Sequence, residues 1–160
     1  MLQRLYATAV IFGLSCTIAL AATISATFNV QIQIQQACST LTANTMAFGN
    51  QNILASTVDA TASVSLVCTN STPFTISFDK GINGTSTLDR QMRGGPANEA
   101  VTYQLYQDAA RTVIWGETTD ARSGTGSGVA QAFTVYGRVP AQTTPAGGSY
   151  SDTITVTVTY

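Results

Sequence analysis

The chain contains no histidine, and this limits the chemistry that its side chains can perform. Nucleophilic catalysis by Ser-His or Cys-His pairs and the common zinc sites are excluded, because each of them uses an imidazole. A glycosidase needs only two carboxylates, and the chain offers Asp59, Asp79, Asp89, Glu99, Asp108, Glu117, Asp120 and Asp152. Most of these lie in expected turns, where aspartate accepts hydrogen bonds from the backbone. We therefore predict that the protein is not an enzyme and holds no metal or other cofactor.

Aromatic side chains offer a second kind of chemistry, the stacking of a sugar ring on Trp115 or on a tyrosine. In a β protein a tryptophan more often packs in the core, and a buried tyrosine more often anchors its hydroxyl in a hydrogen bond. Core packing is therefore the favoured interpretation of Trp115, and a carbohydrate-binding face is the alternative.

Two cysteines of the expected mature chain are placed to form a disulfide. Residues 1–21 have the features of a secretory signal peptide: an early positive charge at Arg4, an apolar run over 7–20 and a small-x-small sequence that ends at residue 21. This run is shorter than a membrane span, so no transmembrane anchor is expected. Cys16 would be removed with the signal. Export then favours a Cys38–Cys68 disulfide over two free buried thiols.

Charged residues make up only 9% of the chain, and the formal net charge is −1. The few basic residues form no stripe or cluster, so nucleic acid is not an expected partner. A surface rich in Thr, Ser and Gln with so little charge favours packing against other protein.

Short stretches of alternating apolar and polar residues run through the mature part, and no amphipathic helical pattern interrupts them. The expected strands are 64–68, 74–78, 101–106, 112–115, 132–139 and 153–160, with a weaker one near 46–48 or 53–55. Loops are expected over 80–98, 116–128 and 142–149. This number of short strands at this spacing predicts one antiparallel β-sandwich.

The two ends of the mature chain carry the most informative patterns. The last expected strand runs to Tyr160, and every second residue near the start is apolar: Ile24, Ala26, Phe28, Val30, Ile32 and Ile34. The stretch 22–34 would make a strand of roughly 43 Å, about twice the usual length. It is either a long first strand of its own domain or a strand donated to a sandwich that lacks one. In the second case Ile24, Ala26, Phe28, Val30 and Ile32 would fill the core of another copy.

Several segments have a specific combination of residues. They are VQIQIQQAC over 30–38, AFG over 47–49, SVSLVCT around Cys68, YQLYQDAART over 103–112, YGRVP from Tyr136, and PAGGSYSDTITVTVTY over 145–160. Taken together, these segments resemble the spore coat protein U domain family. Within that family they resemble the pilin subunits of archaic, Csu-type chaperone–usher pili. The resemblance covers nearly the whole mature chain.

The resemblance implies an all-β fold, an incomplete immunoglobulin-like antiparallel β-sandwich that lacks its last strand and is completed by donor-strand exchange. A periplasmic chaperone would complete each subunit in transit. At an outer-membrane usher, the N-terminal segment of another copy or of a related pilin would then replace the chaperone. Residues 22–34 would be the donor segment and 35–160 the pilin domain, with the Cys38–Cys68 bond tying the first strand to its neighbour. The strand that borders the open groove and meets chaperone or donor would carry Ile154, Val156, Val158 and Tyr160.

The expected function is that of a structural subunit in a secreted surface fibre that supports adhesion or biofilm formation. Tip adhesins of such systems resemble two-domain proteins, whereas this length leaves room for the pilin domain alone, so a shaft subunit is favoured. The protein would pass through the periplasm and end in an extracellular fibre. The alternatives are a self-contained secreted β-sandwich binding module, for instance for carbohydrate, and a structural protein of a coat.

Overall fold

The computed structural model describes residues 21–160. Residues 1–20, which include Cys16 and nearly all of the expected signal peptide, lie outside the described residues. The chain divides into two units, one ending at Gln33 and the other spanning Ile34–Tyr160. Among the described residues, no helix has the length and apolar character of a membrane span.

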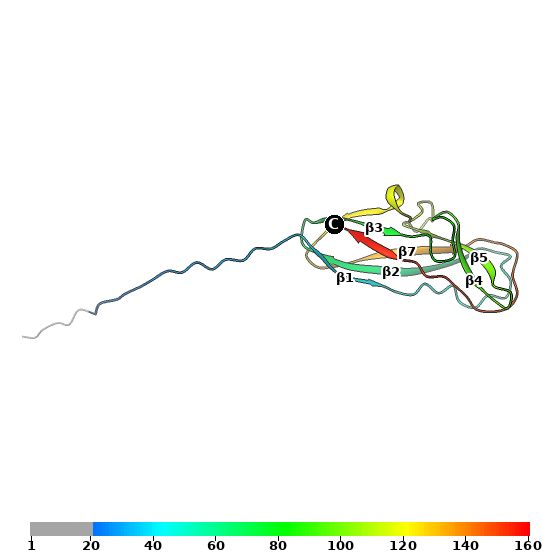
Figure 1. Cartoon of the computed structure of the whole chain (residues 1–160), viewed down its shortest axis with the longest axis horizontal. Helices are drawn as coiled ribbons and strands as arrows, with labels where there is room; N and C mark the ends of the chain where they lie inside the picture. The colour runs from blue at the N-terminus through cyan, green and yellow to red at the C-terminus, as the bar shows by residue number, and fades with distance from the viewer. Residues whose placement is uncertain (1–20) are drawn as a thin grey trace, which may run out of the picture. The chain divides into compact units, whose positions relative to one another are not determined.

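The regular secondary structure of the second unit consists almost entirely of strands, which loops connect (Figure 1). They are β1 (Cys38–Ala43), β2 (Val58–Cys68), β3 (Pro73–Phe78), β4 (Arg90–Gly94), β5 (Glu99–Tyr106), β6 (Arg122–Thr125), β7 (Ala130–Val139), β8 (Tyr150–Ser151) and β9 (Val156–Thr159). One short 3-10 helix, η1 (Thr118–Asp120), precedes β6.

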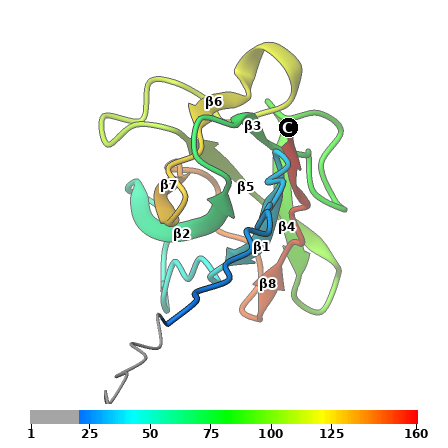
Figure 2. The same ribbon diagram turned by 90° about the vertical axis from the view of Figure 1, so that its left-hand side faces the viewer.

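The strands form two antiparallel sheets. The larger has the order β1-β2-β7-β5-β4-β8 and the smaller has the order β6-β3-β9. Figure 2 looks along the strands and shows them curled around a common interior. Apolar side chains of both sheets meet there, among them Val64 and Leu66 of β2 and Ile76 and Phe78 of β3. The predicted all-β class and antiparallel sandwich are confirmed.

Trp115 lies at the centre of this core. Its side chain is fully buried, its Nε1 donates a hydrogen bond to the carbonyl of Ile76 at 2.9 Å, and its ring stacks on Phe78 with centroids 4.5 Å apart. The favoured core interpretation is therefore confirmed, and Trp115 does not line a sugar-binding face.

Four of the expected strands are present and are longer than predicted, as β2, β3, β5 and β7. The expected strand at 112–115 is wrong, because only Ile114 makes a bridge, to Tyr106. There Asp108 accepts hydrogen bonds from the backbone N–H groups of Thr112 and Val113, which turns the chain instead of extending it. The weak strand near 46–48 or 53–55 is also absent.

Two strands lie within segments that were predicted to be loops. β4 has only one large apolar residue, Met92, and places its buried Arg90 opposite Tyr103, so its sequence shows no apolar alternation. β6 is polar and pairs with β3 at the edge of the smaller sheet. Gly124 of β6 leaves room for the ring of Phe74, since a Cβ there would lie 2.5 Å from the Cζ atom.

Candidate functional site

β1 and β9 are edge strands of different sheets. Within residues 21–160, β1 pairs only with β2, and β9 pairs only with β3. On β9 the strand register runs from Phe78 opposite Val156 to Thr75 opposite Thr159. The expected C-terminal strand therefore exists, but it is shorter than the 153–160 predicted. Each of the two strands leaves one row of backbone groups without a strand neighbour.

The free backbone groups of β9 belong to its apolar residues. Thr153 and Thr155 direct their carbonyls toward the β3 side, where they accept hydrogen bonds from Ile82 and Asp79. Because successive residues of a strand point their N–H and C=O groups to opposite sides, Val156 and Val158 direct theirs to the open side. Their side chains pack against the core, whereas the threonines between them are exposed.

An apolar groove of about 460 Å³ lies between the two free edges. One wall, called the β1 wall below, includes Ala43 at the end of β1 and Met46 and Phe48 in the segment that follows it. The opposite wall includes Ile154 and Val156. The floor is made of core side chains from both sheets, including Val64, Phe78, Leu105 and Val135. A strand placed here would have backbone partners at its edge and apolar side chains beneath it.

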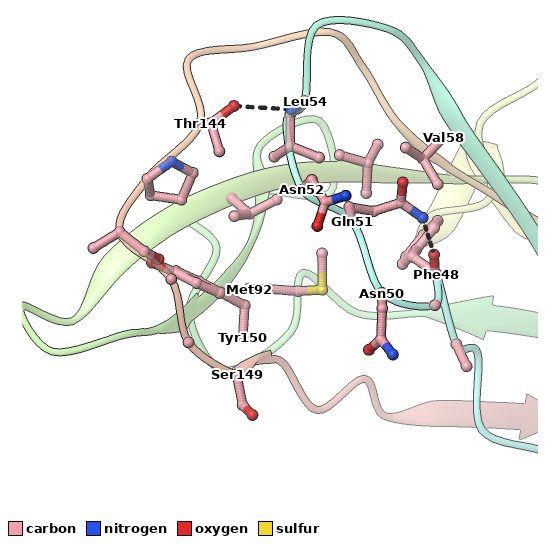
Figure 3. Close-up of a pocket in the computed structure, with 18 of the residues that line it drawn as sticks. Phe48, Asn50, Gln51, Asn52, Leu54, Val58, Met92, Thr144, Ser149 and Tyr150 are labelled. Atoms are coloured by element: carbon pink, nitrogen blue, oxygen red, sulfur yellow. Dashed lines mark hydrogen bonds between the residues drawn. The ribbon is translucent and has the colours of Figure 1, made fainter.

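A second cavity, of about 530 Å³, continues the groove beyond the start of β9 (Figure 3). The two cavities share Met46, Phe48, Met92 and Tyr150 among their lining residues, so they lie next to each other. Two hydrogen bonds brace the loops around the second cavity. Gln51 Nε2 donates to the Phe48 carbonyl at 2.8 Å, and Leu54 N donates to Thr144 Oγ1 at 2.8 Å.

The predicted groove residues fall into two groups. Ile154 and Val156 line the groove, and Val158 packs against the core on the same face of β9. Tyr160 follows the end of β9 and is 62% exposed. Sequence reasoning did not single out Met92, Tyr103 or the β1 wall as groove residues.

The predicted plug residues are Ile24, Ala26, Phe28, Val30 and Ile32. All of them are exposed, with Ile24 at 98% and Phe28 at 86%, and no strand is formed between residues 21 and 37. β1 begins only at Cys38. Residues 21–37 thus carry exposed apolar side chains at alternate positions and belong to no strand.

A disulfide fastens the start of β1. Cys38 and Cys68 face each other in the β1–β2 register and are bonded. The predicted pairing is present in the structure, and it ties one wall of the groove to the neighbouring strand.

A cluster of polar side chains around Asp152 anchors the opposite wall of the groove. Asp152 Oδ1 accepts hydrogen bonds from the backbone N–H groups of Ile82 and Asn83, at 3.1 and 3.2 Å, and from Asn83 Nδ2 at 3.0 Å. Its Oδ2 accepts one from the Tyr103 hydroxyl at 2.7 Å. Burial raises the pKa of Tyr103, and its hydrogen bond to Asp152 raises it further, so the phenol stays a donor.

Arg90 and Asp79 extend this cluster inward. Arg90 is fully buried and donates to the carbonyls of Phe78, Asp79 and Trp115. Partial burial would raise the pKa of Asp79, but hydrogen bonds from Thr155 and Gly81 outweigh it and hold the pKa below its usual range. No sequence pattern identified the contacts from Arg90 to Trp115 and from Thr155 to Asp79, because they join residues 25 and 76 positions apart in the chain.

Two antiparallel sheets with facing free edges define a β-sandwich that resembles a chaperone–usher pilin fold. Residues 24–157 match the Spore Coat Protein U domain, and the chain belongs to this family.

Two known proteins illustrate the relationship. The chain is 30% identical over 159 residues to Protein U of Myxococcus xanthus, covering 88% of this chain and 87% of that protein. Its structure is similar to a chain in the crystal structure of the CsuC–CsuE chaperone–tip adhesion subunit pre-assembly complex from archaic chaperone–usher Csu pili of Acinetobacter baumannii. The TM-score is 0.59 at 22% identity, covering 79% of this chain and 40% of that one. This likeness concerns the fold, and the present chain spans less than half of that chain's length.

Proposed function

We propose that the protein is a structural subunit of a chaperone–usher surface fibre, and that it polymerises by strand donation. Residues 22–34 of one copy would enter the groove between β1 and β9 of the next. One observation carries this proposal: the chain combines an apolar groove between two unpaired strand edges with an unpaired segment of alternating apolar residues. Backbone hydrogen bonds would give affinity, and every second side chain would dock in the groove.

The geometry of the domain is compatible with an open fibre. Cys38, the first residue of β1, lies opposite Cys68, the last residue of β2. Thr159, the last residue of β9, lies opposite Thr75 of β3, the strand that follows β2 after a short turn. β1 therefore begins at the same end of the domain at which β9 ends. A donor running antiparallel to β9 would leave the groove at the other end, near Phe48 and Tyr150. A subunit's own segment and the one it receives would then leave its domain at opposite ends. Such a head-to-tail contact does not close on itself and grows a fibre.

We assign the other partners by the same reasoning. An empty groove exposes apolar surface and strand edges, which makes a chaperone that covers them in the periplasm and an outer-membrane usher the expected partners. The crystal structure with the similar fold is that of a chaperone–tip adhesion subunit pre-assembly complex. A shaft position and an extracellular location, with roles in adhesion or biofilm formation, belong to this proposal.

The family name favours a second arrangement of the same subunits, a coat layer. Strand donation would serve either assembly, because both need subunit-to-subunit contacts that repeat. Electron microscopy of the assembled protein distinguishes rods from sheets.

The test replaces plug residues with aspartate in the exported chain, expressed with its cognate chaperone. We expect Phe28→Asp and Val30→Asp to remain as single subunits bound to the chaperone, because a charge would enter the apolar groove. Asn29→Asp is the matched control, since it adds the same charge on the polar face of the segment and should polymerise. Normal fibres from the Phe28 and Val30 variants would refute strand donation.

A further inference from the structure

The free edge that borders the groove is weakly held by its sheet. β9 has only four residues and pairs with β3 alone. A short edge strand next to an unfilled core is the kind of element that opens locally at low free energy. Something else must keep the segment 152–159 in place while the groove is empty.

Asp152 is the first residue of this segment and contacts two different parts of the domain. Its carboxylate accepts hydrogen bonds from the turn at Ile82 and Asn83 and, through its other oxygen, from Tyr103 of β5. Tyr103 is buried, so this bond is shielded from water. Asp152 therefore joins the start of the edge segment to the turn that follows β3 and to β5 of the larger sheet.

The backbone of the turn fits closely around this carboxylate. Gly81 has a positive φ of 78°, and a Cβ at this position would overlap the Asp152 side chain. Three residues further along, Thr155 donates its N–H to Asp79 Oδ1 at 2.9 Å, which adds a second fastening to the same turn. The groove lies directly beside these contacts, since Tyr103, Asp152 and Ile154 all line it.

We propose that Asp152 is a positioning residue for strand binding. By fastening the 152–155 end of the groove edge to the 79–83 turn and to Tyr103, it keeps the edge of the empty groove in the geometry that an incoming strand needs. This inference rests on the proposed function. In it, Asp152 acts on the binding of the donor strand through the edge segment. An edge that is already ordered spares the donor the entropy of ordering it on binding.

The experiment uses the mature chain carrying both Phe28→Asp and Val30→Asp, so that it accepts a strand but does not donate one. The donor is a fluorescently labelled synthetic peptide of residues 22–34. Fluorescence anisotropy measures peptide dissociation, and hydrogen exchange with mass spectrometry measures protection of residues 153–159 before peptide is added. The second measurement reports on the edge itself, because no donor is present to contact Asp152.

We expect Asp152→Asn to release the peptide about tenfold faster and to lose protection over 153–159, as the loss of a charge-assisted hydrogen bond implies. Tyr103→Phe removes only the 2.7 Å bond to Asp152, keeps the ring in the core and should change both readings in the same direction. The matched control is Asp108→Asn. Asp108 also accepts backbone hydrogen bonds in a turn, from Thr112 and Val113, but does not line the groove.

Each result has a distinct meaning. If the acceptor chain itself does not bind the peptide, the proposed function fails. If the acceptor chain binds the peptide, and Asp152→Asn and Tyr103→Phe leave peptide dissociation and protection unchanged, the positioning role is overturned while strand donation stands. Equal effects from Asp108→Asn would also overturn the positioning role, because the changes would then report general stability.

Discussion

Ala43 of β1 and Val156 of β9 line the same groove, although they belong to the free edges of different sheets. Both strands pair on one side only, so the groove has two rows of free backbone groups and a floor of core side chains. A strand lying between them would pair with the free backbone groups of an edge and would also cover the core side chains on the floor. This relationship leads directly to a test of the acceptor side.

Val156→Asp should abolish acceptance of a strand but leave donation intact. Its side chain faces the groove, so a carboxylate there would be desolvated by the donor and would face apolar side chains. Thr157→Asp is the control, because Thr157 is exposed on the outer face of the same strand. Size-exclusion chromatography of chaperone-released protein would give no polymer for the first variant and normal polymer for the second.

Mixing variants separates the two roles within one experiment. A Val156→Asp chain can still donate, and a Phe28→Asp chain can still accept. Together they should form a species of two subunits and no longer polymer. Long polymers from the mixture would contradict the assignment of donor and acceptor residues.

Removing the disulfide should weaken the β1 wall of the groove. Cys68 is buried and Cys38 begins β1, so the bond restrains a strand that has only one neighbour. The double replacement Cys38→Ser and Cys68→Ser should lower the free energy of unfolding by about 2–5 kcal/mol, the range found for small secreted domains. Urea unfolding of the chaperone-free domain measures this. An unchanged midpoint would show that β1 is held by other contacts.

Much of the sandwich could be predicted because its central strands alternate in hydrophobicity. β2, β3, β5 and β7 cover the expected positions, since each buries one face in the shared core. The β1–β2 disulfide was predictable for a different reason, namely that the expected export would leave two cysteines. Patterns of this kind are local and report on one strand at a time.

The remaining elements depend on contacts between distant residues. β4 buries a charged residue, Arg90, whose guanidinium is satisfied by carbonyls from β3 and from Trp115, and no spacing in the sequence announces this. β6 is polar and needs Gly124 only because Phe74 occupies the space beside it. The cluster around Asp152 joins residues 70, 69 and 49 positions apart in the chain. The sequence places Asp152 in a motif but does not show its partners.

Acid should loosen the edge of the groove through Asp79. The pKa of its carboxyl is lowered in the folded state by hydrogen bonds from Thr155 and Gly81, which outweigh the effect of burial. Stability from this group is therefore fully present above the unfolded value of about 3.9 and is lost as pH falls through the lower folded value. The urea midpoint should hold steady from pH 7 to about 5 and fall below about 4. Asp79→Asn should lower the midpoint at pH 7 and make the fall at low pH shallower, and an identical pH profile would contradict this account.

Asn83→Asp should destabilise the domain at pH 7 and should do so less as the pH falls. The substitution replaces the Nδ2 donor, 3.0 Å from Asp152 Oδ1, with a second carboxylate oxygen. Two carboxylates at this distance repel each other, and one of them binds a proton more readily than usual. We expect a loss of about 1–3 kcal/mol at pH 7, in the range for an unsatisfied buried polar group, with partial recovery as the pH falls toward 5. Deamidation of Asn83, the residue before Gly84, would produce the same aspartate.

Asn70→Asp provides the comparison, because Asn70 lies exposed in the turn between β2 and β3. Urea unfolding of both variants at pH 7 and pH 5 separates a local repulsion from a general effect of added charge. Recovery at pH 5 in the Asn83 variant alone would place the new charge beside Asp152. Equal stability of the two variants at both pH values would mean that the contact between Asn83 and Asp152 contributes little to holding the groove edge.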